Sequence, residues 1–89
     1  MNNPFEHIPF DSARQLEQLS RLAFELREDG KAILQRYGVP TPEALLERIR
    51  AGAVPEHPGY EHYLSACILA TTREAVREQL AAATRELAG

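Results

Sequence analysis

The sequence has no tryptophan, a single cysteine and no long run of apolar residues. Because Cys67 has no second cysteine to pair with, an intramolecular disulfide is excluded, which is typical of proteins that fold in a reducing compartment. None of the apolar runs approaches the ~18 residues of a membrane-spanning helix. Residues 1–7 lack the basic and apolar regions of a secretory signal peptide. We therefore expect a soluble, cytoplasmic protein without a membrane partner.

The chain also lacks an excess of positive charge. Ten Lys and Arg residues stand against thirteen Asp and Glu residues, and the formal net charge is −3. Arginines alternate with glutamates, whereas proteins that bind nucleic acid usually gather basic residues in a patch or stripe. The gap between Gly52 and Tyr60 is too long, and too rich in proline, for the turn of a DNA-binding helix-turn-helix. The sequence therefore predicts no nucleic-acid partner.

No arrangement of residues typical of catalysis or metal binding is present. His62 lies five positions from both His57 and Cys67, whereas ligands that share one helix face are three or four positions apart. Cys67 stands beside Leu64 and Ile68, where a free cysteine usually behaves as a small buried apolar residue. We therefore expect no enzymatic activity, no cofactor and no metal site.

The sequence is rich in Ala, Leu, Glu, Arg and Gln, the residues that enter a helix at least cost. Residues 12–37 and 59–87 each repeat apolar side chains at three- and four-residue steps, and a shorter helical segment, 41–51, lies between them. The two long segments have nearly equal lengths. We therefore predict an all-α fold, in which a long antiparallel helical hairpin with a short intervening helix forms one domain over residues 12–89.

Local signals set the predicted ends of these helices. Residues 1–11 are predicted to form an extended arm, because their two prolines oppose a helix. Ser12 fits a capping box at the start of the first helix. Gly38 fits the left-handed residue that ends it, and Thr41 followed by Pro42 is typical of a new helix start.

The sequence leaves open whether each of the two long helices is continuous at one point. Gly30 either breaks the first helix or lies in the helix contact and lets another helix approach closely, and we favour a continuous helix. Residues 71–74 read as a second capping box, which is the main argument for a break in the last helix near Thr71.

The apolar stripes are longer than one small chain can cover. A chain of this size buries only roughly 60 to 65% of its unfolded surface when it folds alone. We therefore predict a homodimer in which two hairpins pair about a two-fold axis into a four-helix bundle. The side chains predicted to form this core or dimer stripe are Leu16, Leu19, Leu26, Ile33, Leu64, Ile68, Val76, Leu80 and Leu87.

Residues 57–63 combine polar and aromatic side chains at the bend of the hairpin, and such segments on a rigid scaffold often carry binding residues. We predict a small soluble non-enzymatic protein-interaction module, an accessory or regulatory subunit, that binds itself and is open to another protein partner. The alternative is a small-ligand or metal-responsive helical protein that uses the same segment. The residues predicted to contact a partner or ligand are His57, Tyr60, Glu61, His62 and Tyr63.

Overall fold

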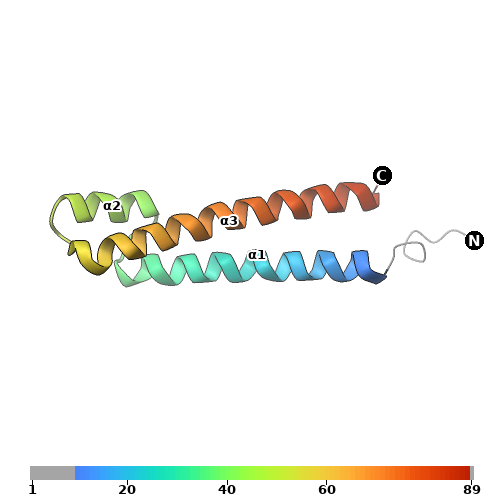
Figure 1. The fold of residues 1–89 in the computed structure, drawn as a ribbon, viewed down its shortest axis with the longest axis horizontal. Coiled ribbons are helices and arrows are strands. Elements are labelled where there is room, and N and C mark those ends of the chain that lie inside the picture. The colour runs from blue at the N-terminus through green and yellow to red at the C-terminus, as the bar shows by residue number, and fades with distance from the viewer. Residues whose placement is uncertain (1–9, 89) are drawn as a thin grey trace, which may run out of the picture.

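The computed structural model describes residues 10–88, which form three α-helices. These are α1 (Phe10–Arg36), α2 (Pro42–Arg50) and α3 (Glu56–Ala88). The long helices α1 and α3 lie side by side and antiparallel, and α2 lies against the first part of α3, at the bend of the hairpin (Figure 1). The predicted all-α hairpin with a short intervening helix is confirmed. No helix in this described part of the chain is long and apolar enough to span a membrane.

The ends of the long helices differ from the prediction by a few residues. Helix α1 begins at Phe10, so Ser12 lies inside the helix and its predicted capping role is wrong. The reason is that serine costs a helix well under about 1 kcal/mol, which a packed helix easily overcomes. The rest of the predicted arm lies outside the described residues. Helix α3 begins at Glu56, but the backbone at His57 and Pro58 is not helical, so the regular helix starts at Gly59 as predicted.

The predicted ends around α2 are confirmed. Gly38 has a φ of 65°, the left-handed conformation expected at the end of α1. The Thr41 hydroxyl accepts a hydrogen bond from the Ala44 amide at 3.1 Å, and Pro42 occupies the first turn. These contacts end α1 and start α2 within a few residues, so the chain turns sharply and α2 lies against the first part of α3.

The most compact core of the molecule lies at this bend. Four apolar side chains are buried there: Val39, Leu45, Ile49 and Val54. Leu45 is completely buried. Gly59 comes so close to this cluster that an added Cβ would lie 3.1 Å from Val54 Cγ1. The absence of a side chain at Gly59 therefore lets α3 start directly on the core.

Away from the bend, α1 and α3 meet along a narrow seam with a seven-residue repeat. The less exposed residues recur at alternating steps of three and four, the pattern of antiparallel coiled coils. In α1 this seam holds Leu16, Leu19, Ala23, Leu26, Gly30 and Ile33, and in α3 it holds Ala66, Leu69, Arg73, Val76, Leu80, Ala83 and Leu87.

Both long helices are continuous. Gly30 lies in the seam, where a Cβ would stand 4.0 Å from the Leu69 Cβ, so the favoured interpretation of Gly30 is confirmed. Helix α3 passes Thr71 without interruption, and the break considered there does not occur.

Seven of the nine predicted stripe residues lie in the seam, and two do not. Leu64 and Ile68 are 57% and 64% exposed, so their assignment to the core of the single chain is wrong. Successive steps of four residues advance about 40° beyond each full turn, so the run that starts at the exposed Tyr60 reaches the side facing α1 only at Val76. Their predicted role in a dimer is not tested by one chain and stays a prediction.

Replacing Gly30 by alanine is expected to raise the free energy of unfolding by about 0.5 to 1 kcal/mol. The added methyl group would make an ordinary contact with Leu69, and alanine loses less backbone entropy in a helix than glycine does. The matched control is Gly38→Ala, which should lower stability by about 1 kcal/mol because its φ is left-handed. Urea unfolding at one fixed chain concentration measures both, and a destabilised Gly30→Ala would contradict the seam geometry.

Truncating Leu45 to alanine is expected to cost about 2 to 5 kcal/mol of unfolding free energy, because its side chain is fully buried in the core at the bend. Phe24 is 61% exposed, so Phe24→Ala should change stability by less than about 0.5 kcal/mol. Thermal and urea unfolding followed by circular dichroism compare the two variants. Similar losses would mean that the bend does not dominate stability.

Candidate functional site

The middle of α3 is unusual because residues 63–72 carry no charged side chain on any side. A surface helix normally carries charged or strongly polar residues on the side away from the core, and this segment has no charged ones. Here α1 covers one side and α2 covers part of a second side near the bend (Figure 1). We call the uncovered side the outer face of α3. Its residues are Tyr60, Leu64, Cys67, Ile68, Thr71 and Ala75.

The outer face is apolar and slightly hollow. Leu64 and Ile68 are more than half exposed. Beside them a shallow depression of about 240 Å³ is lined by Cys67, Ile68, Thr71 and Thr72. Exposed leucine and isoleucine side chains next to a depression are typical of a surface that contacts another protein.

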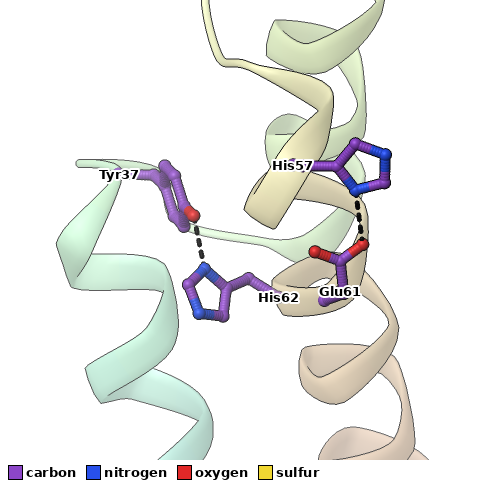
Figure 2. A network of polar contacts seen from close by, with 4 residues as sticks. All are labelled: Tyr37, His57, Glu61 and His62. Atoms are coloured by element: carbon purple, nitrogen blue, oxygen red, sulfur yellow. Dashed lines mark hydrogen bonds and ion pairs between the residues drawn. The ribbon is translucent and has the colours of Figure 1, made fainter.

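The five predicted binding residues point in three directions instead of forming one site, because successive helical residues turn by about 100°. His57 and Glu61 are exposed and form a pair, with 3.0 Å between His57 Nδ1 and Glu61 Oε1 (Figure 2). His62 points to the other side of the helix, toward α1. Tyr63 packs against the core at the bend. Tyr60 stays at the surface and continues the outer face.

A partly buried hydrogen bond between the Tyr37 hydroxyl and His62 Nδ1 closes the hairpin (Figure 2). The ring centroids lie 5.6 Å apart, with the ring planes tilted by 58°. An Arg48 guanidinium nitrogen donates to the Tyr37 carbonyl oxygen at 3.0 Å, so the end of α1 is tied to both other helices. Sequence reasoning missed the Tyr37–His62 pair. Only the seven-residue repeat could have predicted this contact, because it places Tyr37 and His62 at positions of the seam that face each other.

Tyr63 and Cys67 lie one helical turn apart on α3, with Tyr63 packed on the core at the bend and the partly exposed Cys67 at the edge of the outer face. A hydrogen bond with the Cys67 side chain raises the pKa of the Tyr63 phenol above its ordinary value. The protonated phenol can donate a hydrogen bond to the Cys67 sulfur.

A second surface feature lies between α1 and α3, just beyond the start of α2. It is a groove of about 290 Å³ with Leu26, Ala66 and Ala70 among its lining residues. Its cationic lining residues are Arg27, Lys31 and Arg73. Within the described residues, Arg73 Nε is buried without a hydrogen-bond partner. The Glu74 carboxylate also lines the groove, and Lys31 lies 3.6 Å from Glu28, so basic groups outnumber acidic ones there only slightly.

The described residues contain no group of three His, Cys, Asp or Glu side chains arranged to hold a metal ion. His62 is occupied by Tyr37, and His57 by Glu61. The Tyr37–His62 hydrogen bond therefore joins α1 to α3 near the bend, whereas the His57–Glu61 pair is exposed on α3.

Replacing Tyr37 by phenylalanine is expected to lower the free energy of unfolding by about 0.5 to 1.5 kcal/mol, because His62 would lose a partly buried hydrogen-bond partner. The matched control is Glu61→Gln. It removes an exposed pair, with side chains 85% and 58% exposed, and should change stability by less than about 0.5 kcal/mol. Urea unfolding of the two variants decides whether the Tyr37–His62 contact stabilises the bend; equal effects would show that it does not.

Comparison with known proteins gives one match. No curated protein and no solved structure matches this chain. Residues 13–86 match the family described as "Uncharacterized protein MJ0235 family". This span includes nearly all of α1 and α3 and the whole of α2, so the matched unit is the complete hairpin. The chain therefore belongs to the Uncharacterized protein MJ0235 family.

Proposed function

We propose that the protein is a non-enzymatic helical interaction module, an accessory or regulatory subunit, that works as a homodimer. The observation that carries this proposal is the outer face of α3. Leu64 and Ile68 are 57% and 64% exposed on a helix segment that has no charge on any side. A surface of this kind favours contact with another protein.

The energetics support association through this face. Burying a leucine or isoleucine side chain completely contributes about 1.5 to 3 kcal/mol relative to leaving it in water. More than half of that contribution is still available at Leu64 and at Ile68. In a two-fold dimer both copies bury the same side chains, so the contribution is doubled. This helps to offset the loss of translational and rotational freedom on binding.

The face suits a protein partner better than a small ligand or a metal ion. Its depression is shallow and mostly apolar, whereas small-molecule sites are usually concave pockets with a few converging polar groups. The neighbouring polar residues His57 and Glu61 are already paired with each other. Together with Tyr60 they extend the outer face toward the bend, where a further protein partner would meet them.

Light scattering at micromolar chain concentration is expected to give about twice the single-chain mass of 10.0 kDa. The mass should fall toward that of one chain on dilution, because the association is reversible. A mass equal to one chain throughout the accessible concentration range would contradict the homodimer.

A further inference from the structure

We propose that a second copy of the chain binds antiparallel on the outer face of α3, with the two-fold axis passing between Cys67 and Ile68. This inference rests on the homodimer of the proposed function and specifies which surface forms it. The two α3 helices would lie together at the centre, and each α1 would lie on the far side of its own α3.

The position of the axis follows from the extent of the uncharged segment along α3. A two-fold interface uses the same surface on both copies, so that surface must be complementary to itself. The uncharged segment 63–72 has its midpoint between Cys67 and Ile68. An antiparallel alignment about this point places the whole uncharged segment against the same segment of the second copy. A shift along the helix would set part of this segment against the charged residues that flank it in the second copy.

The sizes of the facing side chains also fit this alignment. Leu64 lies opposite Thr71 of the second copy, so that a large side chain meets a smaller one. Ile68 lies beside its own symmetry mate on one edge of the contact, and Cys67 lies beside its mate on the other edge. The shallow depression at Cys67, Ile68, Thr71 and Thr72 is therefore where the two copies meet most closely. Alternation of larger and smaller residues is what close helix packing requires.

Charges next to the uncharged segment are compatible with the same alignment. Tyr60 lies level with Ala75 of the second copy, and Glu61 lies level with Glu74 of the second copy. Because successive residues turn by about 100°, Glu61 is on the same edge of the contact as Ile68 and Glu74 is on the same edge as Cys67, so these two carboxylates lie on opposite edges. No two like charges on this face are brought together. Like charges placed opposite each other would oppose association.

The outer side of α1 does not offer an equivalent surface. It carries exposed ion pairs between Glu17 and Arg21, at 3.3 Å, and between Glu28 and Lys31, at 3.6 Å. Phe24 is 61% exposed but stands alone among these charged residues. Burying that side would desolvate the ion pairs, whereas burying the outer face of α3 desolvates no charge in residues 63–72.

The first test is Ile68→Glu, compared with Phe24→Glu as a matched control on α1. Both side chains are more than 60% exposed, so neither change should unfold the single chain. Ile68→Glu would bring two carboxylates together at the axis, and we expect the dimer dissociation constant to rise about 30-fold or more. Phe24→Glu should leave that constant unchanged. Light scattering gives the masses, and circular dichroism checks that helicity is retained.

The second test measures cross-linking of the native chain, in which no substitution disturbs the proposed contact. Diamide should convert the two Cys67 thiols at the axis into one intermolecular disulfide, while the diamide takes up the two electrons and two protons and becomes a hydrazine. The control is Cys67→Ser combined with Ser20→Cys, which moves the thiol to α1. Non-reducing electrophoresis should show a covalent dimer forming much faster from the native chain than from this control.

The results separate this inference from the proposed function. A native chain that is monomeric throughout overturns both. A dimer that survives Ile68→Glu, with Cys67 no faster to cross-link than the Ser20→Cys control, overturns this face but leaves the homodimer standing. Dissociation by Phe24→Glu and not by Ile68→Glu would place the interface on α1, and that outcome also overturns the inference.

Discussion

The structure depends on the seam between α1 and α3. Each helix offers one stripe at alternating steps of three and four residues, and two helices can bury only the stripes that face each other. Gly30 beside Leu69, and Tyr37 beside His62, keep the same register along the hairpin. The core at the bend then fixes this register at one end, because α2 and the two loops beside it bury four apolar residues against the start of α3.

The seam buries a single stripe of each helix, and the sides of α1 and α3 that remain outside it differ in charge. The outer side of α1 carries exposed ion pairs, so its contact with water costs little free energy. The middle of α3 is uncharged on every side, and neither α1 nor α2 covers its outer face. A small hairpin also buries a modest share of its surface. In the single chain, α3 is therefore the helix that leaves uncharged, largely apolar surface exposed to water.

Local chemistry was enough to predict the features that depend on a few neighbouring residues. The left-handed Gly38, the Thr41 cap and the seam residues of α1 all follow from short sequence signals, and the structure confirms them. The periodicity of α3 was misleading at Leu64 and Ile68 because apolar residues occur on all its sides, so several stripes fit equally well. The Tyr37–His62 bond requires the register of two distant segments, and a buried Arg73 nitrogen in the groove between α1 and α3 has no local signal at all.

This difference between the two helices favours one arrangement of a dimer over another. In a closed four-helix bundle, α1 and α3 would each contact two neighbours, and α1 would have to bury part of its charged outer side. In a row with the two α3 helices at the centre, each α1 touches only its own α3 and keeps its ion pairs in water. The row therefore gives the central position to the helix whose middle is uncharged all round, and it desolvates no charge in residues 63–72.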